Sequence, residues 1–175
     1  FFLALSKGAL LSAGEYERNP YVEEAVWESL RPYFIPWDSP LKKELDAIFL
    51  KNERVTKNFE SMVRAGFNAT EVQGIRALVV KHPKMPGYVF KVLTDEQDSR
   101  PDFSSWLSRV RGAEKIQSAV VKYGYQKYFK VPRKWIYPLP SEPGPSEIRE
   151  GGRKNFILIA EDVSPYPREQ NLKKW

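Results

Sequence analysis

The seven residues "GYVFKVL", residues 87–93, join a turn glycine to an apolar strand that has a lysine in its middle. Tyrosine, valine and phenylalanine are enriched in strands, and glycine suits the turn that comes before them. Lys91 is the exception, because lysine is depleted in strands and is rarely fully buried unless its charge is paired. The stretch therefore predicts a strand over residues 88–93, and it raises the question of what lies against the Lys91 ammonium.

The sequence on both sides of this strand predicts an α+β fold, a small antiparallel sheet with one helix packed on it. "PKMPG", residues 83–87, is a turn that joins the strand to an earlier one. Apolar residues at three- and four-residue intervals predict a helix that ends at Gly124. "NFILIAEDV" is a continuous apolar run, typical of a strand buried on both faces. The expected strands cover residues 75–82, 88–93, 135–139 and 155–163, and the expected helix covers residues 103–123.

The first third of the chain predicts helices. Asn19-Pro20 and Ser39-Pro40 each place a capping residue before a proline, which is a helix-start signal. We therefore divide the chain into a helical extension over residues 1–53, an α+β domain over residues 54–165 and a tail over residues 166–175.

The chain begins with Phe1 rather than methionine, so we expect sequence upstream of it. "FFLALSKGALLSAG", residues 1–14, is either the remnant of a secretory signal or an amphipathic first helix, because Lys7 interrupts the apolar run. Cytoplasmic and secreted locations therefore both stay open. No stretch reaches the roughly 18–20 apolar residues of a transmembrane helix.

Composition and charge narrow the possible chemistry. The chain has no cysteine, which excludes disulfides, thiolate metal sites and cysteine nucleophiles. Residues 1–60 hold 8 Lys and Arg against 10 Asp and Glu, whereas residues 61–175 hold 20 against 12. This basic second part suits an anionic partner such as a nucleotide phosphate, a nucleic acid or a membrane surface. His82 is the only histidine and is expected to be an exposed loop residue, so we expect no metal site.

The expected helix offers a partner for Lys91. A helical residue advances by about 100°, so counting from Trp106 places Glu114 at about 80°. Leu107 and Val121 flank Glu114 on that arc, and the carboxylate is therefore expected on a face that packs. A buried unpaired charge is costly, and two opposite charges lower that cost for each other. We therefore expect Lys91 and Glu114 to pair across the strand–helix interface. The alternative is that each side chain reaches water separately.

This order of elements resembles the amino-terminal lobe of the protein-kinase-like fold. "YVFKVL" is similar to the strand whose lysine contacts nucleotide phosphates, and the helix after it supplies the paired glutamate. The resemblance implies that ATP binds through Lys91 and Glu114. It also implies a gatekeeper at Ala160 and adenine contacts from the backbones of Glu161 and Val163. "VPRKWIYPLP" and "RKNFILIAED" further resemble an uncharacterised kinase-like family of chlamydiae.

Several parts of the kinase pattern are missing from the chain. There is no glycine-rich G-x-G-x-x-G motif before the hairpin, no H-R-D catalytic loop and no D-F-G. No catalytic residue is therefore assigned, and the chain alone is expected to transfer no phosphate. The resemblance implies that ATP and Mg²⁺ chemistry would need a downstream lobe, to which residues 166–175 lead. On this reading the chain is part of a kinase-like phosphotransferase or of a pseudokinase.

Two other functions stay open. The first is a non-enzymatic effector module that engages another protein. The second is a single-stranded nucleic-acid binder, for which the segment "KYGYQKYFKVPRKW", residues 122–135, interleaves cations with aromatic residues. We favour placing these aromatic side chains in the core over nucleic-acid binding, because no known nucleic-acid-binding signature accompanies them.

Overall fold

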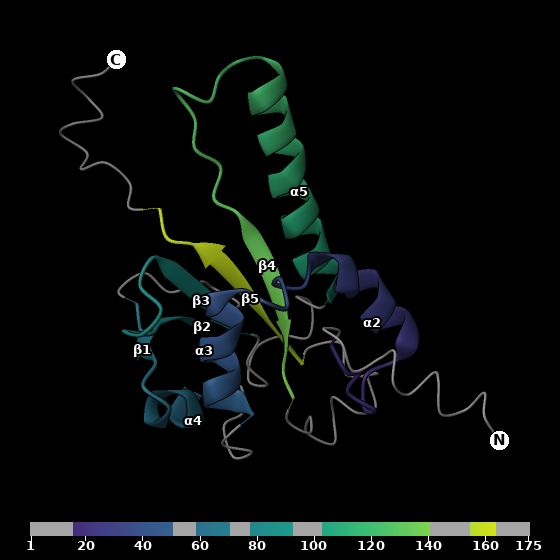
Figure 1. Cartoon of the computed structure of the whole chain (residues 1–175), viewed down its shortest axis with the longest axis vertical. Helices are drawn as coiled ribbons and strands as arrows, with labels where there is room; N and C mark the ends of the chain where they lie inside the picture. The colour runs from purple at the N-terminus through teal and green to yellow at the C-terminus, as the bar shows by residue number, and fades with distance from the viewer. Residues whose placement is uncertain (1–15, 51–58, 71–77, 93–102, 141–154, 164–175) are drawn as a thin grey trace.

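A five-stranded antiparallel sheet forms the centre of the protein, and its strand order is β1-β2-β3-β5-β4 (Figure 1). The computed structural model describes residues 16–50, 59–70, 78–92, 103–140 and 155–163. The strands are β1 (Asn68–Ala69), β2 (Leu78–Lys81), β3 (Tyr88–Val92), β4 (Lys134–Pro138) and β5 (Phe156–Glu161). The predicted α+β class with a small antiparallel sheet is confirmed.

Strand β5 lies between β3 and β4 and is buried on both faces, as its continuous apolar sequence predicts. Successive side chains of a strand point to opposite faces. Ile157 and Ile159 accordingly enter one hydrophobic core, and Phe156 and Leu158 enter the other. The last strand of the chain therefore joins two cores that lie on opposite sides of the sheet.

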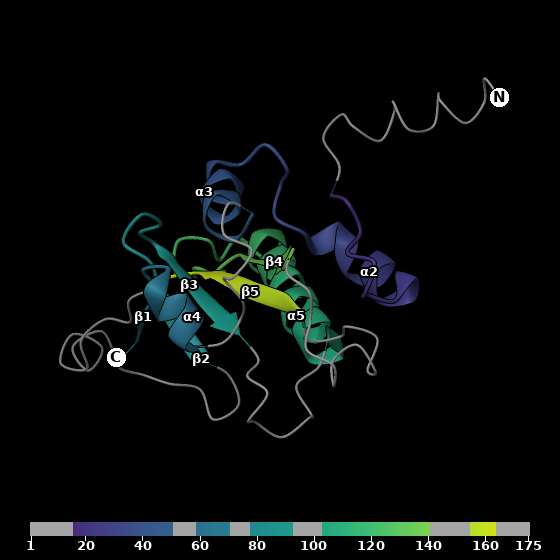
Figure 2. The ribbon, with the colours of Figure 1, turned by 90° about the horizontal axis from the view of Figure 1, so that it is seen from below.

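Helices cover both faces of the sheet, which corrects the prediction of one packed helix. Helices α3 (Pro40–Phe49) and α4 (Phe59–Arg64) supply side chains to the core that contains Ile157 and Ile159. Helices α2 (Glu24–Leu30) and α5 (Phe103–Lys122) supply side chains to the other core. Figure 2 shows α3 and α5 on opposite sides of the strands. The sequence showed which residues were apolar, but it did not show that the first helices divide between the two faces.

The described part of the first fifty residues belongs to the same two cores as the sheet. The 3₁₀ turn η1 (Arg31–Tyr33) leads into Phe34, which forms a parallel bridge with Ile136 of β4. The Ile35 N–H donates a hydrogen bond of 3.0 Å to the carbonyl of the same Ile136. The Asn19 side-chain amide donates to the carbonyl of Leu139 at 3.3 Å. Residues 16–50, predicted as an extension, thus share both cores with the sheet.

One of the two helix-start signals predicts the start of its helix correctly, and the other places the start four residues too early. Helix α3 begins at Pro40 as expected, and the Ser39 hydroxyl accepts a hydrogen bond of 3.2 Å from the Lys42 N–H. Helix α2 begins at Glu24 rather than at Pro20, because the Asn19 carboxamide oxygen instead accepts the Tyr21 N–H in a turn. The predicted tail and the apolar residues 1–14 lie outside the described residues. No helix in the described part of the chain has the length and apolar character needed to cross a membrane.

His82 is buried, which corrects the prediction of an exposed loop residue. Its Nδ1 accepts the Lys84 N–H at 3.2 Å, so its Nε2 carries the proton and donates to the Ala65 carbonyl at 3.1 Å. The ring also makes an edge contact with Phe67, with ring centroids 4.8 Å apart. The imidazole therefore ties the turn after β2 to the end of α4.

The contact between His82 and the α4 terminus predicts unequal costs for two glycine substitutions. Gly66 and Gly87 both have positive φ, at 96° and 85°. A Cβ on Gly66 would lie 2.9 Å from His82 Nε2, whereas a Cβ on Gly87 would meet nothing within 4 Å. We expect Gly87→Ala to cost about 1–2 kcal/mol, the left-handed backbone term. Gly66→Ala should cost roughly 1–3 kcal/mol more, because the His82 ring must move.

Urea unfolding of both variants measures this difference, and Gly87→Ala is the matched control for backbone strain. Equal losses of stability would show that the His82 ring yields without cost.

Candidate functional site

Lys91 lies on the face of the sheet that α5 covers, and it is half-buried. Its neighbours Phe90 and Val92 point to the opposite face and are fully buried there. Lys91 pairs in register with Leu158 of β5, a member of the core beneath α5. Side chains of this strand therefore alternate between the two faces as predicted. The aliphatic stem of Lys91 lies on an apolar surface.

The expected ion pair between Lys91 and Glu114 is not formed. Glu114 lies exposed on α5, and no ion pair among the described residues joins it to Lys91. The reason is that α5 enters the core beneath the sheet through Leu107 and Val110, which both lie in its first half. Residues 114–119 are all exposed, and so is Val121, which the helical count had placed on the packed arc. Angular position on a helix indicates burial only where the helix has a neighbour.

In the part of the chain that the structure describes, the charges that act on Lys91 come from two cations. Burial, followed by the charges of Arg109 on α5 and Lys134 on β4, lowers the pKa of the Lys91 ammonium. Burial and Arg109 likewise lower the pKa of Lys134. We call these three residues the Lys91 cluster. Like charges gathered on a partly desolvated surface are stabilised by an anion placed between them.

Ala160 lies beside the Lys91 cluster on the same face of the sheet. It is the register partner of Lys134 on one side and of Val89 on the other, and it is buried. Its small side chain leaves the surface between the two lysine-bearing strands low. Ala160 thus lies on the same face of the sheet as Lys91, two residues along β5 from the register partner of Lys91, and Glu114 lies outside this surface.

Glu161, the last residue of β5, is held by Arg133, the residue before β4. The Glu161 carboxylate accepts hydrogen bonds from the Arg133 side chain at 2.7 and 2.9 Å and from the Arg133 N–H at 3.0 Å. Burial acts to raise the pKa of this carboxyl, but the bonds from Arg133 hold it below its usual value. The Glu161 N–H donates to the Arg133 carbonyl. Val163 is exposed, and its side chain is 41% accessible.

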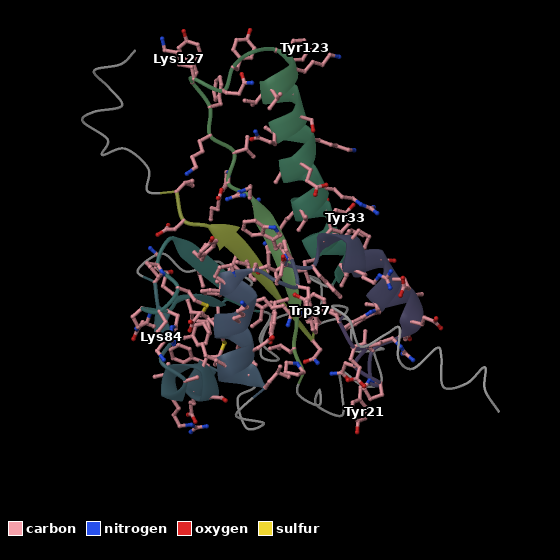
Figure 3. All side chains as sticks on the ribbon, viewed as in Figure 1. Tyr21, Tyr33, Trp37, Lys84, Tyr123 and Lys127 are labelled. Carbon is pink, nitrogen blue, oxygen red and sulfur yellow. The ribbon has the colours of Figure 1, made fainter. Side chains whose placement is uncertain are left out.

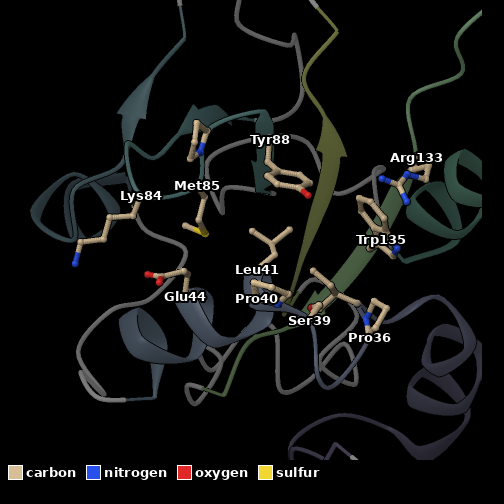
Figure 4. Close-up of a pocket in the computed structure, with 12 residues that line it drawn as sticks. Pro36, Ser39, Pro40, Leu41, Glu44, Lys84, Met85, Tyr88, Arg133 and Trp135 are labelled. Atoms are coloured by element: carbon tan, nitrogen blue, oxygen red, sulfur yellow. The ribbon is translucent and has the colours of Figure 1, made fainter.

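An apolar groove of about 470 Å³ lies on the opposite face, between α3, the turn after β2 and the start of β4 (Figure 4). Tyr88 and Trp135 form part of its wall, with ring centroids 6.2 Å apart. The Arg133 guanidinium lies 5.1 Å from the Trp135 ring centroid, and Glu161 neutralises its charge. Much of the remaining lining consists of Met85 and three prolines, Pro36, Pro40 and Pro86. Glu44 and Lys84, of opposite charge, also lie in the lining, so the groove suits a largely apolar ligand without net charge.

A buried ionic network joins α3 to β4, and our sequence interpretation missed it. Lys42 is 5% accessible, and its ammonium donates to the Asp46 carboxylate. The same ammonium lies 3.7 Å from the Trp37 ring centroid and 5.0 Å from the Tyr16 ring centroid. The Tyr137 hydroxyl donates to the other Asp46 oxygen at 3.0 Å. Burial, and then the Asp46 charge, raise the pKa of both the Tyr16 and Tyr137 hydroxyls.

This network is structural, because each of its charged groups already has a partner. The Tyr16 hydroxyl donates to the Ile35 carbonyl at 2.6 Å, away from Asp46. A cavity of about 270 Å³ adjoins the network, with Asn19 and Leu50 in its lining. A signal for the network was present in the sequence. Helical spacing places Lys42 about 20° from Phe49 and about 60° from Leu45, inside the apolar arc of α3.

Possible metal ligands do not gather in the part of the chain that the structure describes. No group of three His, Asp or Glu side chains within the described ranges is placed to hold a metal ion.

Removing one partner from the buried network should be strongly destabilising. We expect Asp46→Ala to lower the free energy of unfolding by about 3–5 kcal/mol, because it leaves the Lys42 ammonium buried without its counter-charge. The double variant Lys42→Met/Asp46→Leu should lose much less, since it removes both charges together.

Chemical denaturation of the two variants gives the comparison. Glu28→Ala is the control, because its ion pair with Arg31 is 3.8 Å long and exposed, and its loss should cost at most about 1 kcal/mol. A double variant as unstable as Asp46→Ala would contradict the electrostatic origin of the loss.

Comparison with protein-family models, with curated proteins and with solved structures finds no match for this chain. The resemblance to kinase-like proteins therefore stays a prediction from the sequence, and the functional proposals below depend on the geometry of the described residues.

Proposed function

We propose that this chain binds the phosphate groups of an anionic ligand, with ATP as the leading candidate, at the Lys91 cluster. The observation that carries the proposal is that two half-buried lysines, Lys91 and Lys134, lie on one face of the sheet opposite Leu158 and Ala160 of β5. Burial and the neighbouring cations also lower the pKa of Lys91. An ammonium in that position is costly in the free protein. A bound phosphate would add negative charge beside the two lysines and form charge-assisted hydrogen bonds with them.

The order of elements supports a kinase-like, amino-terminal-lobe character for the module. A strand that bears the lysine is followed by helix α5 and then by two more strands, β4 and β5. In this proposal the nucleotide base would lie beyond the end of β5, near Ala160 and Val163. The Glu161 N–H already donates to Arg133, so the base would meet the backbone after Glu161. Glu114 has no part in the proposed site.

The proposal includes binding but no phosphate transfer by this chain alone. The described residues near Lys91 supply no general base, and they supply no carboxylates for Mg²⁺. A metal would enter with the nucleotide or be held by groups from elsewhere. In this proposal the chain supplies the phosphate-binding residues of a site, and groups from elsewhere would be needed for phosphate transfer.

Substitution of Lys91 should separate ligand binding from stability. Lys91→Met and Lys134→Met should each weaken ATP binding by about 10- to 100-fold, since a hydrogen bond to a charged group contributes roughly 1.5–3 kcal/mol. Lys91→Met should also stabilise the free protein slightly, because it removes a charge that has like-charged neighbours, and solvent screening at this half-buried position keeps the gain small. An anion bound at the cluster should raise the pKa of Lys91.

Calorimetric titration with ATP, with and without Mg²⁺, measures the affinities, and thermal unfolding measures the stability. Lys43→Met is the matched control, because Lys43 is an exposed lysine on α3. Inorganic triphosphate as competitor tests whether the phosphates or the base are recognised. ATP binding that is absent from the wild-type chain, or equal in Lys91→Met, would rule out the proposed site.

A second candidate function is a non-enzymatic interaction module, which the groove between α3 and β4 favours. Tyr88 and Trp135 give it an aromatic wall. Its charged lining residues balance, because Glu44 and Lys84 have opposite charges and Arg133 is paired with Glu161. Aromatic-lined grooves of this kind accept extended proline-rich segments, which lack many of the backbone donors that would need partners. The proposed occupant is therefore an uncharged, proline-rich peptide.

Fluorescence anisotropy with a labelled polyproline peptide tests this second candidate. We expect Tyr88→Ala to weaken binding by about tenfold, because it removes one aromatic wall. Tyr33→Ala is the control, since Tyr33 packs against the core on the opposite face. Peptide binding that Tyr88→Ala leaves unchanged would exclude the groove, and it would leave the phosphate proposal untouched, because the two sites lie on different faces.

A further inference from the structure

The turn that follows α5 exposes four aromatic side chains at one end of the molecule. Tyr123, Tyr125, Tyr128 and Phe129 are 64%, 52%, 72% and 59% accessible. Our sequence interpretation favoured placing them in the core, and the structure corrects it. Tyr123 and Lys127 mark this end in Figure 3, at the top of the molecule's longest axis. We call residues 122–130 the aromatic tip.

The aromatic tip has a defined backbone conformation. Gly124 has φ of 72° and closes α5, with its N–H donating to the Val121 carbonyl. The Tyr125 N–H donates to the Val120 carbonyl, which completes a Schellman motif. A further turn follows, because the N–H groups of Tyr128 and Phe129 both donate to the Tyr125 carbonyl. The rings are therefore presented by hydrogen-bonded turns at the end of a projecting helix.

The segment that contains the tip is basic. Residues 115–140 contain no aspartate or glutamate and six cations: Lys115, Lys122, Lys127, Lys130, Arg133 and Lys134. Within the described residues, the three lysines of the tip form no ion pair. The Lys122 and Lys127 ammonium groups lie 5.4 and 5.8 Å from the ring centroids of the tyrosines that follow them. Lysines thus lie beside exposed aromatic rings. This combination suits a partner that has an anionic surface and an apolar interior.

We propose that the aromatic tip binds the surface of a membrane that contains anionic lipids. Phe129 and the tyrosine rings would enter the headgroup region, where amphipathic aromatic side chains are favoured. The three lysines would contact acidic headgroups, each with its stem along the apolar patch. Apolar insertion and basic attraction together supply the two signals that stable peripheral binding needs.

The shape of the tip favours a membrane over a single-stranded nucleic acid. A nucleic-acid strand is held by a basic groove that follows its backbone, with rings on which successive bases stack. Here the aromatic residues lie at the end of a projecting element, where a flat surface can be reached. Tyr125 and Phe129 meet edge to face, with centroids 6.3 Å apart and planes at 87°, so the two rings do not form parallel stacking platforms.

The test is co-sedimentation of the chain with phosphatidylcholine vesicles, with and without phosphatidylserine. We expect binding that depends on phosphatidylserine and weakens with salt. Tyr128→Ser/Phe129→Ser should reduce it by about tenfold or more, since both rings leave the surface. Lys127→Gln/Lys130→Gln should reduce it by a similar factor on acidic vesicles. Leu50→Ser/Val63→Ser is the control, because it removes two exposed apolar side chains far from the tip.

Thermal unfolding confirms that each variant is folded, which is expected because the substituted side chains are exposed. Three results would overturn the proposal. The first is the absence of binding that depends on phosphatidylserine. The second is vesicle binding that both tip variants retain, which would place the membrane contact elsewhere in the chain. The third is binding to a labelled oligothymidylate that the tip variants lose while vesicles are not bound, which would assign the tip to nucleic acid.

Discussion

The pairing of β5 between β3 and β4 is the interaction on which the rest of this structure depends. Its two neighbours come from segments separated by the long helix α5, so the sheet closes only when residues 156–161 are in place. The strand is buried on both faces, and its alternate side chains enter separate cores. It also sets the functional surfaces. Lys91 and Lys134 meet on one face because they stand opposite Leu158 and Ala160 of the same strand.

Lys42 and Lys91 show how different surroundings affect a lysine that is partly or fully removed from water. Lys42 lies deep in an aromatic enclosure, and its charge is met by Asp46 one helical turn away on the same helix. Lys91 is less buried, but its charged neighbours are Arg109 and Lys134. The first arrangement is complete and holds α3 against β4. Within the described ranges the charges that act on Lys91 are cationic, and this is why an anionic ligand is proposed at Lys91 and none at Lys42.

Much of the fold could be predicted from the sequence, whereas less of the site could. The runs around Phe90 and Ile157 predicted strands because apolar β-branched and aromatic residues stand there without breaks. Strand β1 was missed, since it is two residues long and exposed on both of them. Glu114 was misplaced because helical spacing cannot show where α5 leaves the sheet. Lys42 was overlooked although its spacing from Leu45 and Phe49 carried the same signal that drew attention to Lys91.

The sequence by itself determined the local features of this protein: where strands and helices form, which strand carries a lysine, and where cations and aromatic residues alternate. These follow from backbone preference and from the period of apolar residues, which depend on near neighbours. Only the tertiary structure decided which charges meet and which rings stay in water. Arg109, and not Glu114, is the α5 residue whose charge acts on Lys91. The Tyr128 ring is exposed because α5 packs on the sheet over part of its length. Contacts between segments distant in sequence depend on where each element ends in space, and no local pattern contains that information.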